Sequence, residues 1–443
     1  LAGAGASSGM AMAHWEIQGW MILILGWVFV PFYSRSMVYT MPEFLERRYN
    51  PQSRTILSVI SLVSYVLTKV AVTVYAGGLV FQQVFGIKEL WGIDFFWIAA
   101  IGLVVLTALY TIFGGMKSVL YTSVLQTPIL LLGSLIILVL GFKELGGWDE
   151  MMRVCGAVTV NDYGDTMTNL IRSNDDANFP WLGALIGSAI IGFWYWCTDQ
   201  FIVQRVLSGK NEKEARRGTI FGAYLKLLPV FLFLIPGMIA FALHQKYIGA
   251  GGEGFLPMLA NGTANADAAF PTLVAKLLPA GVKGLVVCGI LAALMSSLAS
   301  LFNSSAMLFT IDFYKRFRPE TPEKKLVGIG QIATVVIVIL GILWIPIMRS
   351  VGDVLYTYLQ DVQSVLAPGI AAAFLLGICW KRTSAQGGMW GLIAGMIIGL
   401  TRLGAKVYYS NAGEVADSTF KYLFYDMNWL FFCGWMFLFC III

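Results

Sequence analysis

One lysine stands inside an otherwise apolar stretch of the chain. Lys226 lies between Phe221 and Leu243, with no other charged residue in that interval. A charged side chain at membrane depth is costly, and it usually faces a bundle interior or a water-filled cavity. The position therefore indicates either a ligand-binding group or one half of a structural ion pair with an intramembrane acid.

A second polar interruption lies near the other end of the chain. Gln360 and Asp361 fall inside the apolar stretch 352–379, which also contains Pro368. Proline bends a helix because it lacks a backbone N–H. A bent helix here could present the Gln360 amide to a hydroxylated ligand, or its polar groups could be satisfied locally.

Three adjacent aromatic residues, Trp194, Tyr195 and Trp196, occupy the middle of another apolar stretch and are followed by Asp199. Aromatic belts of membrane proteins lie at the lipid–water interfaces. The centre of a span is the wrong depth for such a belt, so these rings are candidates for contact with a ligand.

A fourth candidate is a pair of serines. Ala293, Ser296 and Ser297 fall at i, i+3 and i+4 of one predicted helix and therefore share a face. Two hydroxyls, with backbone carbonyls of a broken helix, can ligate a small hard cation. Serines in membrane helices also commonly hydrogen-bond to neighbouring helices, so the residues alone leave both interpretations open.

Enzyme signatures are missing from the sequence. The chain has two histidines, His14 and His244, and neither belongs to an HExxH motif; there is also no CxxC motif and no phosphate-binding loop. The polar groups inside the apolar stretches suit binding better than bond cleavage.

Membrane-spanning helices must position these side chains. The chain has 443 residues, of which 58% are hydrophobic and 12% charged, and one spanning helix needs about 20 apolar residues. We predict eleven spans, at 15–33, 54–83, 92–113, 119–142, 181–206, 217–244, 283–313, 326–348, 352–379, 386–408 and 421–443.

Basic residues concentrate in every second loop between these spans, as the positive-inside rule requires. The clusters include Arg47 and Arg48, Arg216 and Arg217, and Lys315 with its neighbours. This alternation supports the span count and accounts for the Lys and Arg residues without a nucleic-acid partner.

Several longer motifs carry a family resemblance. The most specific runs from Trp194 to Gln200, reads WYWCTDQ and continues to Arg205. TMPEF at 40–44, LMSSL at 294–298 and FNS at 302–304 support it. Together these motifs resemble the sodium/solute symporter family, specifically its sodium/glucose cotransporter branch.

The resemblance implies an all-α membrane protein with a leucine-transporter-like fold, in which two inverted repeats of five helices surround a midplane site. About eleven full transmembrane helices and a truncated first core helix would form a single transporter domain, 1–443. Residues 1–13 would then be the outer half of the first core helix, 15–379 core helices two to ten, and 386–443 the peripheral helices.

The resemblance also implies roles for individual residues. Glu16, Lys226 and Gln360 match the sugar hydrogen-bonding positions, and Tyr195 matches the aromatic residue that stacks on the sugar ring, with Trp196 beside it. Leu1, Trp15 and Tyr356 match the outer hydrophobic gate. Ala293, Ser296 and Ser297 match the sodium site.

We therefore predict a sodium-driven symporter of a glucose- or galactose-like monosaccharide. It would work by alternating access as a multi-pass protein of the plasma membrane, or of the inner membrane in a bacterium. It would not be an enzyme, and its partners would be the sugar, Na⁺ and membrane lipid, with no nucleic acid. Two alternatives stay open: symport of myo-inositol or another polyol, and a glucose sensor without net transport.

Overall fold

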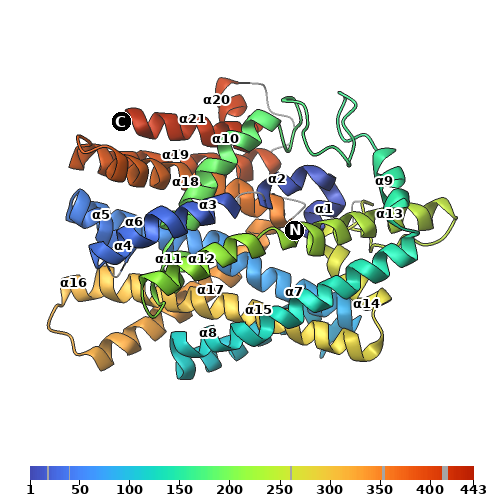
Figure 1. The fold of residues 1–443 in the computed structure, drawn as a ribbon, viewed down its shortest axis with the longest axis horizontal. Coiled ribbons are helices and arrows are strands. Elements are labelled where there is room, and N and C mark those ends of the chain that lie inside the picture. The colour runs from blue at the N-terminus through green and yellow to red at the C-terminus, as the bar shows by residue number, and fades with distance from the viewer. Residues whose placement is uncertain (17–18, 39, 260–261, 352–354, 412–417) are drawn as a thin grey trace.

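The computed structural model describes residues 1–16, 19–38, 40–259, 262–351, 355–411 and 418–443. The chain folds into a bundle of helices that run mainly along its long axis (Figure 1). A short hairpin, in which β1 (Glu89–Leu90) pairs antiparallel with β2 (Ile93–Asp94), is the one sheet among the described residues, and isolated β-bridges occur in the loops.

The first half of the described chain contains α1 (Ala2–Ser8), η1 (Gly9–Met12), α2 (Ala13–Glu16), α3 (Gly19–Ile24), η2 (Leu25–Phe29), α4 (Val30–Ser36), α5 (Met41–Arg48), α6 (Pro51–Ser64), η3 (Tyr65–Val70), α7 (Ala71–Phe85), α8 (Phe95–Leu145), α9 (Trp148–Gly156), α10 (Trp181–Gly192), η4 (Phe193–Thr198) and α11 (Gln200–Leu207). Here η1 is a 3-10 turn, whereas η2, η3 and η4 are π-helical.

The second half contains α12 (Glu212–Leu225), η5 (Val230–Leu234), α13 (Ile235–Gly249), η6 (Ala266–Ala268), α14 (Ala269–Leu277), α15 (Ala280–Met307), η7 (Leu308–Tyr314), α16 (Lys315–Phe317), α17 (Glu323–Val351), α18 (Leu355–Cys379), α19 (Ala385–Asn411), α20 (Thr419–Lys421), η8 (Tyr422–Asp426) and α21 (Trp429–Ile442). Of the irregular segments, η6 is a 3-10 turn and η5, η7 and η8 are π-helical.

The helices agree with the predicted spans. Within the described residues, nine helices are long and apolar enough to cross a membrane, and the bent pair Thr419–Asp426 and Trp429–Ile442 adds a tenth. The shorter apolar helix Phe95–Leu109 lies where the third span was predicted. The eleven predicted spans therefore each correspond to a helical segment.

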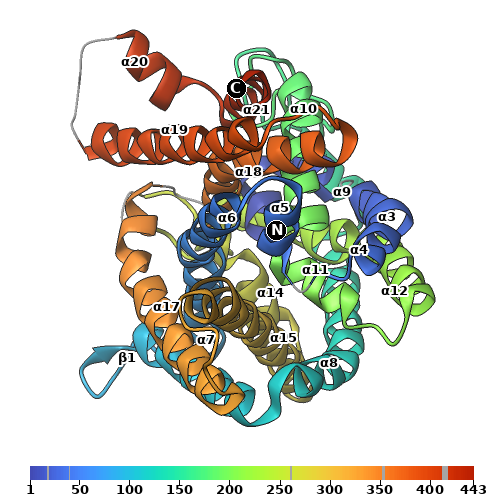
Figure 2. The ribbon, with the colours of Figure 1, turned by 90° about the vertical axis from the view of Figure 1, so that its left-hand side faces the viewer.

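One difference concerns α8, which is a single helical segment of 51 residues where two separate spans were predicted. A straight helix would place Leu103 and Ser123 about 30 Å apart. Yet the side chains of Leu103 and of Leu294 on α15 both lie against Gly77, and Ser123 contacts Ser296, which is also on α15. Leu103 and Ser123 therefore lie at the same level of α15. The chain therefore reverses its direction within α8, and its two parts are separate crossings (Figure 2).

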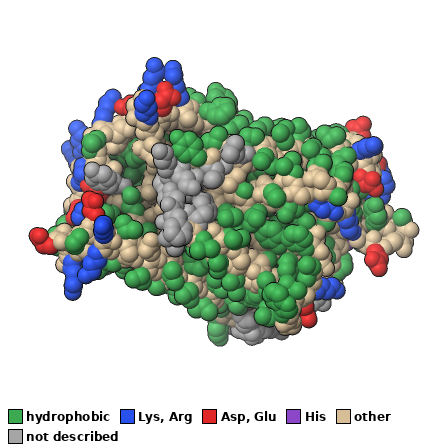
Figure 3. Space-filling view, turned by 90° about the horizontal axis from the view of Figure 1, so that it is seen from below, with side chains coloured by type: hydrophobic (Ala, Val, Ile, Leu, Met, Phe, Trp, Pro, Cys, Tyr) green, Lys and Arg blue, Asp and Glu red, His purple; other side chains and the backbone are tan. Residues whose placement is uncertain are grey.

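Charge is segregated along the long axis. Charged side chains gather at the two ends of the molecule, and a largely apolar surface lies between them (Figure 3). The end that contains α5 and α16, on the left in Figures 1 and 3, is called the basic end here, because Arg47, Arg48, Lys315 and Arg316 lie on these helices. This distribution fits helices that cross a bilayer.

Small residues let α18 and α19 approach closely. A Cβ atom added to Gly399 would lie 2.4 Å from the carbonyl oxygen of Val365, and one added to Gly395 would lie 2.9 Å from the Cα of Gly369. These positions belong to a glycine repeat that also includes Gly391, and such repeats permit close backbone packing of membrane helices. Glycine is therefore required at this interface.

Candidate functional site

A break in one span positions Lys226. The apolar run Glu212–Gly249 is interrupted after α12, which ends at Leu225, and it resumes with η5 at Val230. Pro229 explains the break, because it cannot donate a hydrogen bond to the carbonyl of Leu225 four residues earlier. Lys226 thus lies at the end of a half-helix, where helix ends commonly build binding sites in transporters.

Glu16 and Lys226, which are 210 residues apart in the sequence, form an ion pair. Glu16 ends α2 and is 2% exposed. The Lys226 ammonium also lies 5.7 Å from the centroid of the Trp196 ring. The ion-pair interpretation of the lone lysine is thus confirmed, and its partner Glu16 is another of the residues predicted to bind the sugar.

The predicted aromatic pair lies on the π-helical segment η4. The rings of Tyr195 and Trp196 have centroids 4.9 Å apart and planes inclined by 80°. Tyr195 contacts a second ammonium group, since the Nζ atom of Lys69 lies 4.9 Å from its ring centroid. Short π-helical segments occur frequently at functional sites, because they displace side chains from the regular helical positions.

Sequence reasoning gave Lys69 no role, yet Lys69 forms a buried ion pair with Asp199. Their side chains are 9% and 3% exposed. The Tyr65 hydroxyl donates to Asp199 Oδ1 over 2.8 Å, and the Lys69 ammonium lies 4.4 Å from the centroid of the Phe201 ring. The sequence contains a signal for this pair, because two opposite charges inside two apolar stretches are expected to form an ion pair.

Gln360 lies on α18 and is 3% exposed. Its Oε1 atom is buried and has no hydrogen-bond donor among the residues that the structure describes. α18 packs against η4, the segment that carries Tyr195 and Trp196. A buried amide oxygen needs a donor, so Gln360 can accept a hydrogen bond from a ligand.

The two candidate sodium-binding serines of α15 have different surroundings. The Ser296 hydroxyl lies 2.5 Å from the hydroxyl of Ser123 on α8. Ser297 instead lines a cavity of about 400 Å³ together with Ala293. Of the three predicted positions, Ala293 and Ser297 therefore border open space, whereas Ser296 is engaged with a neighbouring helix.

A carboxyl group lies on the wall of the same cavity. Asp267 belongs to η6, outside the spans, and its Oδ2 atom accepts a hydrogen bond of 2.9 Å from the N–H of Leu355. Burial raises the pKa of Asp267 to about 6, against the effect of this hydrogen bond. When it is ionised, this carboxyl group favours a cation over an anion in the cavity.

The structure describes the side chains of only some of the residues in the predicted outer gate. Leu1 lines the cavity beside Ala293 and Ser297. Trp15 is 7% exposed and its ring packs against Trp429, with centroids 5.4 Å apart. The side chain of Tyr356 lies outside the described residues, so the gate as a whole stays a prediction.

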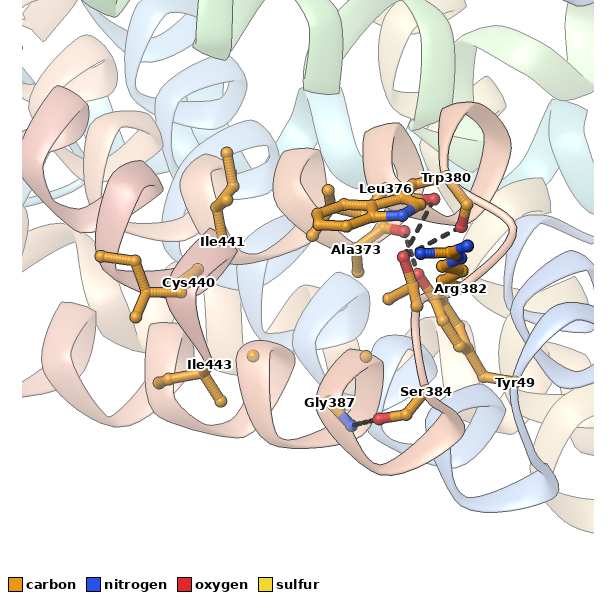
Figure 4. A pocket seen from close by; sticks show the side chains of 14 residues that line it. Tyr49, Ala373, Leu376, Trp380, Arg382, Ser384, Gly387, Cys440, Ile441 and Ile443 are labelled. Carbon is orange, nitrogen blue, oxygen red and sulfur yellow. Dashed lines mark hydrogen bonds between the residues drawn. The ribbon is translucent and has the colours of Figure 1, made fainter.

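A separate pocket lies at the basic end of α18 and α19 (Figure 4). Its polar groups are largely engaged with one another: the Tyr49 hydroxyl donates to the carbonyl of Ala373 over 2.7 Å, and the N–H of Gly387 donates to the Ser384 hydroxyl over 2.9 Å. Burial raises the pKa of Tyr49 to about 12, so this hydroxyl stays protonated. None of the predicted site residues lines this pocket.

Residues 1–395 match the sodium:solute symporter family. The chain belongs to this family. Among curated relatives of this chain, the sodium/myo-inositol cotransporter 2 of Homo sapiens is 37% identical over 416 residues, which cover 91% of this chain and 61% of the relative. The sodium/glucose cotransporter 1 of Ovis aries is 37% identical over 461 residues, covering 100% of this chain and 68% of the relative.

The chain spans about three fifths of the length of the myo-inositol cotransporter relative, at 61%. A solved structure of a Na⁺-coupled sialic acid symporter, in a substrate-bound outward-open state, superposes with a TM-score of 0.72. The two are 21% identical, and the superposition covers 100% of this chain and 84% of the other. The predicted family and the predicted leucine-transporter-like fold are thus confirmed.

Proposed function

We propose that this symporter couples the entry of Na⁺ to the uptake of a neutral monosaccharide or a related polyol, by alternating access across the plasma membrane or a bacterial inner membrane. The observation that carries the proposal is the ion pair between the buried Glu16 and the partly buried Lys226, beside Trp196. A carboxylate and an ammonium offer an acceptor and donors to hydroxyl groups. An aromatic face adds a surface for the apolar side of a sugar ring.

The pairing of charges favours a neutral substrate. Glu16 and Lys226 compensate one another, so the carboxylate of an anionic sugar would lie near Glu16 while Lys226 is already paired. An uncompensated charge in such a site is costly. Gln360 adds a buried acceptor for a substrate hydroxyl, and Tyr195 is proposed to stack on the substrate ring.

Sodium is proposed to bind at Ala293 and Ser297, with Ser296 in support. Carbonyl and hydroxyl oxygens are suitable ligands for a small hard cation, and the ionised Asp267 on the same cavity wall attracts positive charge. Leu1 borders this cavity and Trp15 packs against Trp429, which is compatible with a hydrophobic outer gate that also contains Tyr356.

Two substrates, a glucose-like sugar and myo-inositol, compete as the transported solute. Relatives include both sodium/glucose and sodium/myo-inositol cotransporters at 37% identity. The competing proposal is therefore symport of myo-inositol, and the site residues named above would bind its hydroxyls equally well.

Uptake into proteoliposomes that contain the full-length protein tests the proposal. We expect labelled glucose or myo-inositol to accumulate in sodium buffer and not in choline buffer, and the more effective unlabelled competitor to identify the substrate. Sodium-dependent currents with no accumulation of label would favour a sensor. Equal uptake in sodium and choline would contradict the proposed coupling.

Replacing Ser297 with alanine should weaken sodium binding. Loss of one oxygen ligand is expected to cost about 1 kcal/mol, or about a fivefold higher sodium concentration for half-maximal uptake. Ser305→Ala is a matched control, because Ser305 is a buried serine of the same helix that does not line the cavity. An unchanged sodium dependence in Ser297→Ala would remove Ser297 from the sodium site.

A further inference from the structure

The residue after Gln360 carries a buried charge that the proposed transport reaction does not use. Asp361 is 7% exposed and forms an ion pair with Lys406 of α19. Its other carboxylate oxygen, Oδ1, is buried and has no hydrogen-bond partner among the residues that the structure describes. Lys406 forms an ion pair with Asp361 that joins two helices, and the buried guanidinium of Arg402 is a second positive charge that Asp361 attracts.

The helix that supplies Lys406 is itself anchored. Arg402 lies one turn before Lys406, on the same face of α19, and is fully buried. Its guanidinium donates to the carbonyl of Met427 over 2.6 Å and to that of Leu423 over 3.2 Å. It also lies 4.2 Å from the centroid of the Phe432 ring. Arg402 therefore holds α19 against η8 and α21.

Backbone contact limits how α18 can move against α19. Gly395 and Gly399 of α19 lie against Gly369 and Val365 of α18 without room for a Cβ atom. The Asp361–Lys406 pair lies beyond these contacts, toward the first residues of α18. The glycines thus fix the distance between the helices, and the ion pair restrains the rotation of α18 at the level of Gln360.

Rotation matters because adjacent residues of an α-helix point about 100° apart. While Asp361 is held toward Lys406, Gln360 is directed to a different side of α18. α18 packs against α19 and α21 and also against η4, which carries the aromatic pair. A turn of α18 that broke the ion pair would also move the Gln360 amide.

We propose that Asp361 is a positioning residue for substrate binding: its ion pair with Lys406 fixes the rotation of α18 and thereby aims Gln360 at the substrate. The peripheral helices α19 and α21 then act as the support of the substrate-binding helix. The inference rests on the proposed function, because it requires Gln360 to bind the transported sugar or polyol.

The test uses a paired substitution in the full-length protein. A single change would leave one buried charge without its partner and could prevent folding, whereas replacing both charges by apolar residues is often tolerated. For Asp361→Leu with Lys406→Met, we expect normal amounts in the membrane. The substrate concentration for half-maximal uptake should rise about tenfold, as when one hydrogen bond is lost. Sodium binding without substrate should stay unchanged.

Lys406→Arg serves as the conservative control, because it keeps the charge and should retain nearly normal substrate affinity. The decisive comparison adds Gln360→Ala. If Asp361 acts through Gln360, the paired substitution should cause no further loss of substrate affinity in the Gln360→Ala background. Full additivity of the two effects, or an equal loss of sodium and substrate binding, would overturn the positioning role.

The same measurements separate the two proposals. Wild-type substrate affinity in Gln360→Ala would contradict the proposed binding site itself. A weakened Gln360→Ala variant, together with an unaffected Asp361→Leu/Lys406→Met variant, would retain the binding site and overturn only the inference about Asp361.

Discussion

Lys226→Met is expected to abolish measurable substrate binding. The substitution removes the proposed charge-assisted hydrogen bond to the substrate, worth about 1.5–3 kcal/mol. It also removes the ammonium group that pairs with the Glu16 carboxylate, which is 2% exposed. Together these effects should lower substrate affinity by at least about 100-fold, since about 1.4 kcal/mol corresponds to a factor of ten. Binding of labelled sugar to purified protein measures the change.

A paired variant separates binding from stability. Breaking a buried ion pair by removing one partner costs about 3–5 kcal/mol of stability, whereas removing both charges is far less costly. Glu16→Gln with Lys226→Met should therefore recover the folded protein without recovering substrate binding. If this paired variant transports like the wild type, the ion pair is purely structural and the proposed binding site is wrong.

Asp199→Asn should destabilise the protein more than any exposed charge substitution. Lys69 would keep its buried ammonium, 9% exposed, and lose its counter-ion. Aromatic rings at 4.4 to 4.9 Å from the Lys69 ammonium would offset part of the loss by cation–π attraction. The expected net cost remains about 3–5 kcal/mol, which thermal unfolding in detergent should register as a clearly lower midpoint.

Glu214→Gln is the matched control for this experiment. Glu214 pairs with Arg217 at the surface, where the two side chains are 53% and 65% exposed, and exposed pairs contribute about 0–1 kcal/mol. Its unfolding midpoint should stay close to that of the wild type. Equal midpoints for Asp199→Asn and Glu214→Gln would show that the Lys69–Asp199 pair does not stabilise the contact between η3 and the junction of η4 with α11.

The membrane helices could be predicted because hydrophobicity is a local property. Each apolar stretch must form a helix in lipid, where every backbone polar group needs an internal partner. The break at Lys226 was also encoded locally, since Pro229 prevents a continuous helix. The glycines of α19 permit a close helix contact, and α18 supplies that contact at Gly369 and Val365.

Family motifs predicted which residues share a site, and composition alone could not do so. Glu16 and Lys226 were assigned to one site by resemblance, and the fold brings them into contact although they are 210 positions apart in the sequence. Composition alone left Lys226 as either a ligand-binding group or an ion-pair partner, because a lone charge in an apolar stretch does not identify its counter-ion.

Only the tertiary structure decided which buried groups meet. Lys69 and Asp199 belong to spans 130 residues apart, and the reversal of α8 brings Ser123 to Ser296 while Ser297 borders the cavity. Asp361 likewise finds its ion-pair partner, Lys406, only on the next helix. The sequence by itself determined that these polar groups lie inside apolar helices. Which of them pair depends on the rotation and depth of each helix, and these follow from packing contacts between segments far apart in the chain.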